Sequence, residues 1–337
     1  MSPAPLLALF ALGVWGVARV GVSAVRRWAA RRHLLDYPTA RSSHLQPTPL
    51  GGGLAIVLPV LLGWWGWALV AGFAGGGLGW TAGALLVAAV GWADDLRPIP
   101  PLARLLVQAL AAAIAAAAIH PAGVWIIAVP VWIVALTNIF NFMDGLDGLA
   151  GLQGVVAGLG WALLGWIGQT PEVMAAGLIV AAACLGLLGE NWTPARIFMG
   201  DVGSTFLGFS FAVLPLWNWS DPADVPTPAG HLVLGALVLW PFIFDASVTI
   251  LRRVKGGEAL LQSHRSHLYQ RLAAAGWSHG RVARRYAMLS GVGIACAVLA
   301  QAAPEVGAWL APGAMLLIGA TLWTSARGAE ARRAARS

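Results

Sequence analysis

Charged residues are scarce in this sequence, and their scarcity decides its class. Only 10% of the 337 residues are Asp, Glu, Lys or Arg, whereas 58% are hydrophobic, and the mean hydropathy is +0.74. Soluble domains carry about 25% charged residues, so the composition excludes a soluble globular protein. Repeated apolar runs long enough to cross a bilayer indicate a polytopic, all-α membrane protein instead.

Cysteine is almost absent, which excludes two further classes of site. The two cysteines, Cys184 and Cys296, lie singly inside apolar runs. Neither a disulfide framework nor a thiolate metal centre is therefore indicated. There is also no Cys/His zinc spacing, no Ser-His-Asp elbow and no Gly-X-Gly-X-X-Gly motif after a strand.

Eleven apolar runs are long enough to be membrane spans. The first has no basic segment before it and no small-residue cleavage site, so we expect a retained span and not a removed signal peptide. Several runs are rich in Ala and Gly, which suits helices whose backbones approach closely. The expected spans are Leu6–Val25, Leu50–Val70, Gly77–Trp92, Leu102–Ile119, Val124–Phe140, Leu149–Ile167, Val173–Leu188, Val202–Trp217, His231–Leu251, Arg285–Ala302 and Val306–Ser325.

The basic residues predict the orientation of the chain. If it crosses the membrane alternately, all 21 Lys and Arg residues fall at one face. The loops at the other face contain no Lys or Arg, and their charged residues are the acids Glu172, Asp221, Asp224 and Glu305. By the positive-inside rule, the basic face is cytoplasmic, the N-terminus lies outside and the C-terminus lies in the cytoplasm. This topology accounts for the net charge of +7, so we expect no nucleic-acid partner.

The chain reads as one membrane domain, residues 1–337, whose longer loops gather at the cytoplasmic face. Because most polar residues lie there, we expect the chemistry at that face. The cytoplasmic loops are 26–49, 94–101, 141–148, 190–201 and 252–284.

Polar residues recur at every third position between two apolar runs, at Asn138, Asn141, Asp144 and Asp147. In an ideal helix each step of three slips by about 60°, so the set shares one side only if the helix tightens or breaks. The glycines that follow Asp144 and Asp147 supply a break. A helix cap could explain one carboxylate but hardly four polar groups. Such groups beside apolar spans mark a functional site, where we expect a hard cation and a phosphate to meet.

Two adjacent carboxylates, Asp94 and Asp95, end the third span. They repel each other and favour a nearby cation, proton or arginine. Arg104, at the start of the next span, could counter a substrate phosphate. The alternative is a simple polar stop to the helix, followed by a Pro-rich linker.

A third motif, Arg196-Ile-Phe-Met-Gly-Asp201-Val-Gly-Ser204, precedes the eighth span. It puts a carboxylate and free backbone N–H groups at a helix N-terminus, which suits an anion or a metal with a phosphate. The alternative is that Asp201 or Ser204 simply caps the helix.

A fourth motif, His264-Arg265-Ser-His267, lies in the longest cytoplasmic loop. Histidines beside arginines suit a nucleotide diphosphate. The alternative is a basic surface helix that contacts anionic lipid headgroups. Asp245, a buried acid in the ninth span, could be the structural partner of an arginine.

Together with a Pro/Gly-rich loop from Asp36 to Gly53, these motifs resemble, in this order, the polyprenyl-phosphate N-acetylhexosaminyl-1-phosphate transferases of glycosyltransferase family 4. That family includes phospho-MurNAc-pentapeptide translocase and enzymes that initiate O-antigen synthesis. The resemblance implies an enzyme of the inner (plasma) membrane that uses Mg²⁺ at the cytoplasmic face. It would transfer a HexNAc-1-phosphate from a UDP-sugar to undecaprenyl phosphate and release UMP.

The same resemblance implies roles for individual residues. Asp94 and Asp95 match the paired aspartates of the family, Asp201 matches its Mg²⁺-binding aspartate with Asn141 as companion, and His267 matches the first histidine of its cytoplasmic cluster. The implied catalytic residues are Asp94, Asp95, Asp144 and Asp147; the substrate-binding residues are Asn138, Arg104, Arg196, His264, Arg265 and His267; and the metal ligands are Asn141 and Asp201.

This sequence departs from the family pattern at several positions. Tyr269 and Gln270 stand where many members have histidines, and Leu50 replaces a frequent arginine. The His-Arg-Ser-His-X-Tyr-Gln form is closer to the O-antigen branch, which uses deoxy sugars such as FucNAc or QuiNAc. The sugar, the glycan pathway, a direct or covalent mechanism, and a homodimer all stay open.

Two other classes remain as alternatives. An ion-coupled transporter would carry acids near the bilayer midplane, usually with inverted repeats, whereas here the acids cluster at one face. A CDP-alcohol phosphotransferase also has Asp-Gly motifs, and Asp144 begins an Asp-X-X-Asp-Gly sequence. No arginine follows it at the expected place, however, so the UDP-sugar enzyme is favoured.

Overall fold

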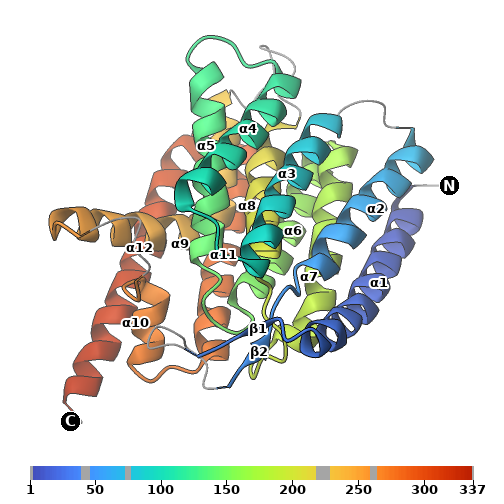
Figure 1. Ribbon diagram of the computed structural model, residues 1–337. Coiled ribbons are helices and arrows are strands. Elements are labelled where there is room, and N and C mark those ends of the chain that lie inside the picture. Colours follow the sequence, from blue (N-terminus) through green and yellow to red (C-terminus); the bar gives the residue numbers. More distant parts are fainter. Residues whose placement is uncertain (1–2, 39–45, 73–76, 218–227, 259–263, 336–337) are drawn as a thin grey trace.

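The computed structural model describes residues 3–38, 46–72, 77–217, 228–258 and 264–335. Within these ranges the chain is almost entirely helical, which confirms the expected all-α membrane fold (Figure 1). Parts of the expected loops 26–49 and 252–284 lie outside the described residues. The elements are α1 (Pro3–Arg31), β1 (Leu35–Asp36), β2 (Thr48–Pro49), α2 (Leu54–Ala71), α3 (Leu78–Leu96), α4 (Pro101–Ile119), α5 (Trp125–Phe142), α6 (Leu149–Ile167), α7 (Pro171–Asn191), α8 (Asp201–Val213), the 3₁₀ turn η1 (Leu214–Leu216), α9 (Pro228–Lys255), α10 (Leu268–Ala274), α11 (His279–Ala302) and α12 (Pro304–Ala334).

Each expected span corresponds to one helix, although the bounds of several helices differ from the expected ones. In the described part of the chain, nine helices are long and apolar enough to cross a membrane. The two other expected spans are α3, which ends beside Asp94 and Asp95, and the shorter apolar stretch Asp201–Leu216. The short helix α10 follows His267, where a helix was expected only under the alternative of a basic surface helix. The orientation of the bundle in the membrane stays a prediction.

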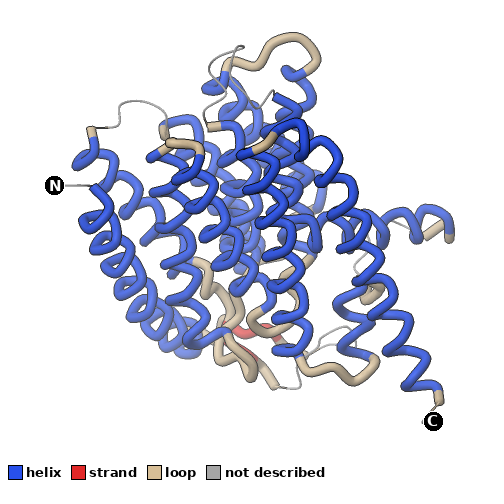
Figure 2. The backbone as a smooth tube through the Cα atoms, turned by 180° about the vertical axis from the view of Figure 1, so that it is seen from behind, coloured by secondary structure: helices blue, strands red, loops and turns tan. Residues whose placement is uncertain are grey.

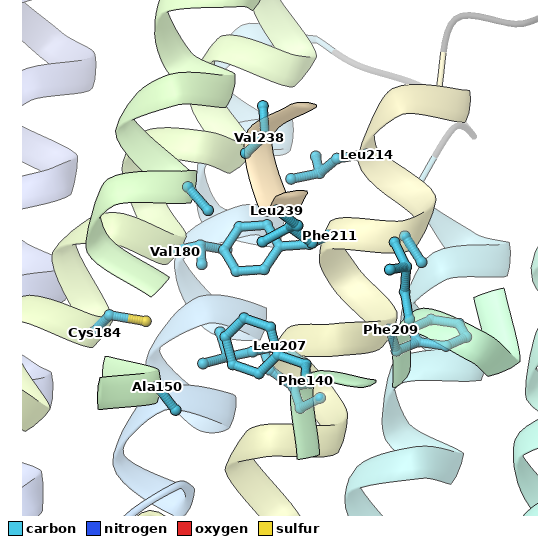
Figure 3. Close-up of a cluster of buried hydrophobic side chains, with 14 of the residues drawn as sticks. Phe140, Ala150, Val180, Cys184, Leu207, Phe209, Phe211, Leu214, Val238 and Leu239 are labelled. Carbon is cyan, nitrogen blue, oxygen red and sulfur yellow. The ribbon is translucent and has the colours of Figure 1, made fainter. Parts of the chain in front are cut away.

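Helix α8 lies inside the bundle, in contact with both α3 and α5. Every residue of α8 after Asp201 is buried. Figure 3 shows the aromatic layer that this burial produces, in which Phe140 of α5 faces Phe211 of α8 with ring centroids 5.8 Å apart. The buried position of α8 fixes its N-terminus, and therefore Asp201, in the middle of one end of the bundle.

Small residues let the neighbouring helices α6 and α7 approach closely. A Cβ atom on Gly158 would lie 2.7 Å from the carbonyl oxygen of Gly177, so no larger side chain fits there. Lipid is as apolar as a leucine side chain, so close packing of this kind is what holds membrane helices together.

A main-chain seam joins two distant loops at the end of the bundle that carries β1, β2 and α10 (Figures 1 and 2). The N–H of Phe198 donates to the carbonyl of Pro49, and the N–H groups of Gly52 and Gly53 donate to the carbonyls of Phe198 and Met199, at 2.7–2.8 Å. The seam holds the start of α2 against the segment that leads into α8.

Candidate active site

A polar cavity of about 360 Å³ lies at the end of the bundle that carries the seam. Residues from β1, α3, α5, α7, α8, α10 and the loops beside them line it. Five of these residues are aspartates, and none is Lys, Arg or His in the described part of the chain. The aspartates are Asp36, Asp95, Asp144, Asp147 and Asp201. A cavity with so many carboxylates favours a bound cation.

Arg104 connects two of the predicted site residues. Its Nη1 lies 2.5 Å from Oδ2 of Asp94 and 2.9 Å from Oδ2 of Asp201. The other oxygen of Asp94 accepts a hydrogen bond from the N–H of Ile99 at 2.6 Å. Asp94 does not itself line the cavity; it holds the guanidinium of Arg104 beside Asp201.

Asp95 binds the start of α8. Its two carboxylate oxygens accept hydrogen bonds from the N–H groups of Asp201 (2.8 Å) and Val202 (3.1 Å). These N–H groups have no partner within the helix, and a negative charge beside them is favourable. Gly200, at φ +77°, leaves room for this contact, because a Cβ atom there would lie 2.5 Å from the Asp95 carboxylate.

The loop between α5 and α6 carries Asp144, which faces the cavity. No hydrogen bond to its carboxylate is found among the described residues. Burial raises the pKa of Asp144 well above its ordinary value, and the charges of Asp201 and Asp95 raise it further. An ionised Asp144 therefore needs a cation close by, or the group stays protonated.

The pKa of Asp147, three residues further on, is shifted in the opposite direction and is lowered. Burial alone would raise its pKa, but hydrogen bonds from His279 and from the N–H of Ala195 outweigh this effect and lower it. Oδ2 of Asp147 lies 3.3 Å from Nδ1 of His279 and 3.2 Å from the N–H of Ala195. Asp147 thus ties its loop to α11 and to the segment before α8.

The two predicted metal ligands lie side by side. The side chain of Asn141 hydrogen-bonds the carboxylate of Asp201, and its Oδ1 accepts a hydrogen bond from the hydroxyl of Ser204 at 3.1 Å. Both residues line the cavity. They come from α5 and α8, the two helices joined by the aromatic layer.

Asp245, buried in α9, organises the histidine segment. Its carboxylate accepts hydrogen bonds from the backbone N–H groups of Leu268 (2.8 Å) and Tyr269 (3.0 Å) and from the hydroxyl of Tyr286 (2.6 Å). It also lies 3.1 Å from Nδ1 of His267. The sequence suggested an arginine as the partner of Asp245; the partners are instead a histidine, a tyrosine, Thr249 and the first turn of α10.

Helix α10 is held in this way against the aspartate loop, which we define as residues 143–148 between α5 and α6. The hydroxyl of Tyr269 donates to the carbonyl of Phe142 at 3.1 Å, and its ring lies against Gly145. Gln270 lines the polar cavity. The two residues that replace histidines of the family pattern therefore lie beside the aspartate loop, one as a support and one as part of the wall.

Other predicted substrate-binding residues do not line the cavity. The side-chain amide of Asn138 donates to Gln108 (2.6 Å) and to the carbonyl of Val134 (2.8 Å), because α5 continues as a regular helix past Asn138. Arg196 and Arg265 are exposed, and their roles stay predictions.

His264 lies on the loop before α10, where its ring stacks on His267. Burial lowers the pKa of His264 to about 4, and the charge of His267 is the second cause. His264 is therefore neutral at pH 7. It can donate a hydrogen bond to a substrate phosphate but supplies no positive charge.

Several residues of the site were not among the predicted ones, among them Asp36, Asn191, Gln270 and His279. Asp36 and Gln270 belong to motifs that the sequence singled out, so their chemistry was visible but not their position. His279 begins α11, where nothing in the sequence distinguishes it from a surface histidine.

The residues present fit a hard divalent cation. Asn141, Asp144 and Asp201 offer only oxygen ligands, which Mg²⁺ prefers, and the Asp144 carboxylate has no hydrogen-bond partner among the described residues. Among those residues, no three His, Cys, Asp or Glu side chains converge closely enough to hold a metal alone. That pattern suits Mg²⁺, which usually keeps several waters or substrate phosphate oxygens.

Comparison with known proteins shows the family of the chain. The model of "Glycosyl transferase family 4" matches residues 78–218, a range that includes Asp95, Asp144 and Asp201. A Bacillus subtilis protein described as "Probable undecaprenyl-phosphate N-acetylglucosaminyl 1-phosphate transferase" is 30% identical over 282 residues, which cover 76% of this chain and 74% of that protein. The chain belongs to this polyprenyl-phosphate hexosamine-1-phosphate transferase family.

Other members of glycosyl transferase family 4 resemble the chain to a similar degree. The "Decaprenyl-phosphate N-acetylglucosaminephosphotransferase" of Mycobacterium tuberculosis is 28% identical over 320 residues, or 82% of this chain and 78% of that protein. The "Phospho-N-acetylmuramoyl-pentapeptide-transferase" of Thermosynechococcus vestitus is 30% identical over 301 residues, or 76% of this chain and 75% of that protein. Membership of a transferase family favours the transferase over the transporter and the CDP-alcohol enzyme.

Proposed function

We propose that this protein transfers a HexNAc-1-phosphate from a UDP-sugar to undecaprenyl phosphate, giving the undecaprenyl-diphospho-sugar and UMP. The observation that carries the proposal is the convergence of Asp95, Asp144 and Asp201, from three separate segments, on one cavity beside Arg104. The names of the relatives, which specify polyprenyl-phosphate acceptors and N-acetylglucosamine phosphate, support it.

The reaction is attack by an oxygen of the acceptor phosphate on the β-phosphorus of the UDP-sugar. A new P–O bond forms, the bond to the bridging oxygen breaks, and that oxygen leaves with UMP. The acceptor is mostly a dianion at pH 7, because the second pKa of a phosphate monoester is about 6. The main difficulty is therefore to bring two anions together and not to remove a proton.

The residues of the site would have different roles in this reaction. Asn141 and Asp201 would hold Mg²⁺, with Asp144 beside them, and the ion would neutralise charge on the diphosphate and the leaving UMP. Arg104, held by Asp94 next to Asp201, would add a positive charge for a phosphate oxygen. Asp95 keeps Asp201 in place and, with Asp144, would position the acceptor or accept its residual proton. Gln270 in the cavity wall would contact the donor.

The proposal includes the setting of the reaction. We place the site at the cytoplasmic face of the inner (plasma) membrane, because the cavity lies among the Arg-rich loops. The expected role is the start of a cell-envelope glycan of the O-antigen type, in a protein that could act as a homodimer. The donor would be a UDP-N-acetylhexosamine.

The test is to incubate the purified protein with undecaprenyl phosphate, Mg²⁺ and a panel of UDP-sugars, and to measure UMP release and the lipid product. The panel contains GlcNAc, the deoxy sugars FucNAc and QuiNAc, and MurNAc-pentapeptide. We expect Mg²⁺-dependent release with one N-acetylhexosamine donor. No release with any of them, from a folded protein, would refute the proposal.

The role of Asp201 as a metal ligand is tested by Asp201→Asn. The matched control is Glu172→Gln, at the end of α7 that is remote from the polar cavity. We expect Asp201→Asn to abolish transfer while the protein stays folded and inserted, and Glu172→Gln to leave transfer unchanged. Full activity of Asp201→Asn would overturn the assignment.

A further inference from the structure

A second cavity, of about 570 Å³, lies between α10, α11 and the C-terminal end of α12. It shares no lining residue with the polar cavity. Its walls consist of alanines, one glycine, Trp277 and three arginines, Arg281, Arg332 and Arg333, with no carboxylate among them. We call it the arginine cleft.

Each arginine of the cleft keeps most of its hydrogen-bonding capacity. The guanidinium of Arg281 lies 3.9 Å above the ring of Trp277, a contact that fixes its position but uses no N–H group. Arg333 donates one N–H to the carbonyl of Ala274. No hydrogen bond or ion pair of Arg332 is found among the described residues. Arg281, Arg332 and Arg333 are all exposed.

The nearest acid on α12 does not neutralise the cleft. Glu330 is bound to Arg271 through two hydrogen bonds, of 2.6 and 2.7 Å, so its charge is already compensated. Three guanidinium groups around one opening repel each other unless an anion lies between them. Their planar donor pairs match the oxygens of a phosphate, which Arg binds through paired hydrogen bonds.

The position of the cleft agrees with a membrane surface. Figure 1 shows α10 and the C-terminal end of α12 at the same end of the bundle as β1 and β2. Trp277 lies in the wall of the cleft, and tryptophan is enriched where membrane proteins meet the headgroup region. Anionic headgroups attract clustered arginines at such a surface.

We propose that the arginine cleft binds a phosphate group, separately from the polar cavity and independently of the transferase reaction. The phosphate is carried by an anionic phospholipid or is free in solution. In either case, Arg281, Arg332 and Arg333 contact its oxygens, and the alanine-lined wall admits the group to which it is attached.

The test compares two variants in which three arginines become glutamine. The first changes Arg281, Arg332 and Arg333. The control changes Arg27, Arg31 and Arg32, which are exposed at the C-terminal end of α1. Both lose the same charge. Binding is measured by native mass spectrometry after reconstitution in phosphatidylcholine alone or mixed with equal parts of phosphatidylglycerol, and by thermal shift with inorganic phosphate in detergent.

We expect the cleft variant to lose phosphatidylglycerol or phosphate binding by at least about tenfold, and the α1 variant to lose less than half of it. Loss only in the lipid arm identifies a headgroup, and loss only in the phosphate arm identifies a soluble anion. Equal losses in the two variants, or no binding in either arm, would overturn the proposal.

Because Arg333 also contacts α10, the single variant Arg332→Gln is a necessary second measurement. It removes a charge but no hydrogen bond or ion pair that Arg332 forms within the described residues. We expect weaker binding at an unchanged unfolding temperature in phosphate-free detergent. Unchanged binding by Arg332→Gln would contradict the proposal even if the triple variant failed to fold.

Discussion

The carboxylate of Asp95 accepts a hydrogen bond from the backbone N–H of Asp201 at 2.8 Å, so the residue that caps α8 also places its predicted metal ligand. The adjacent Asp94 reaches Asp201 only through Arg104. The two neighbouring aspartates thus have different partners. Asp95 binds backbone N–H groups, and Asp94 binds the guanidinium of Arg104. The sequence shows the pair but cannot separate their tasks.

Replacing Asp95 by alanine should destabilise the protein as well as inactivate it. The N–H groups of Asp201 and Val202 would lose their acceptors, which costs about 1–3 kcal/mol for a buried donor. Asp95→Asn keeps one oxygen and should lose less. The free energies of unfolding of both variants in detergent test this. An Asp95→Ala protein as stable as the wild type would show that the contact is dispensable.

Replacing Asp144 by asparagine should have the opposite effect on stability. Because the pKa of Asp144 is raised in the folded protein, the folded state binds this proton more tightly, and the wild type loses stability as pH rises above about 3.9. Asp144→Asn removes that loss, so the variant should be at least as stable as the wild type at pH 8 in EDTA. We expect kcat to fall by at least about a hundredfold. Wild-type kcat would exclude Asp144 from the chemistry.

The contact between Gly145 and Tyr269 should show up in a double-mutant cycle. A Cβ atom on Gly145 would overlap the hydroxyl of Tyr269, so Gly145→Ala should displace the aspartate loop and reduce activity. Tyr269→Phe removes the hydroxyl and should partly rescue Gly145→Ala, with a coupling energy of about 1 kcal/mol or more. Additive effects of the two substitutions on stability and on kcat/KM would contradict the contact.

The low pKa of His264 predicts a pH dependence of stability. The folded protein keeps His264 neutral down to about pH 4, whereas a histidine in the unfolded chain is protonated below about 6.5. Within this window the unfolded state binds more protons, so stability falls as the pH is lowered from 6.5 to 4. His264→Gln should flatten the unfolding temperature over this range. An equally steep fall in the variant would assign the effect to other groups.

Most of the fold was predictable because each span is a long apolar run with polar ends. The bounds of helices differ from the expected ones where a helix cap or a high helix propensity extends the helix beyond its apolar run. Helix α11 starts at His279 and not at Arg285, because the side chain of Ser278 caps it by accepting from the N–H of Arg281. Helix α12 continues past Ser325, since an Ala- and Arg-rich segment is a good helix former.

The site was predictable only in part. Asp95, Asn141, Asp144, Asp147 and Asp201 come together because each follows or precedes a span at the same end of the bundle. Spacing along one segment could not show where α5 ends. The helix includes the first two members of the polar series, and the first of them contacts α4 instead of the cavity. Contacts between distant segments, such as that of Asp147 with His279, have no signature in a single sequence.

The seam between Pro49, Gly52, Gly53 and the residues before α8 is formed only by main-chain atoms. Leu50 belongs to the same segment and lines the polar cavity. The side chain at position 50 therefore sets the electrostatic character of the cavity wall without contributing to the main-chain hydrogen bonds that hold the loop.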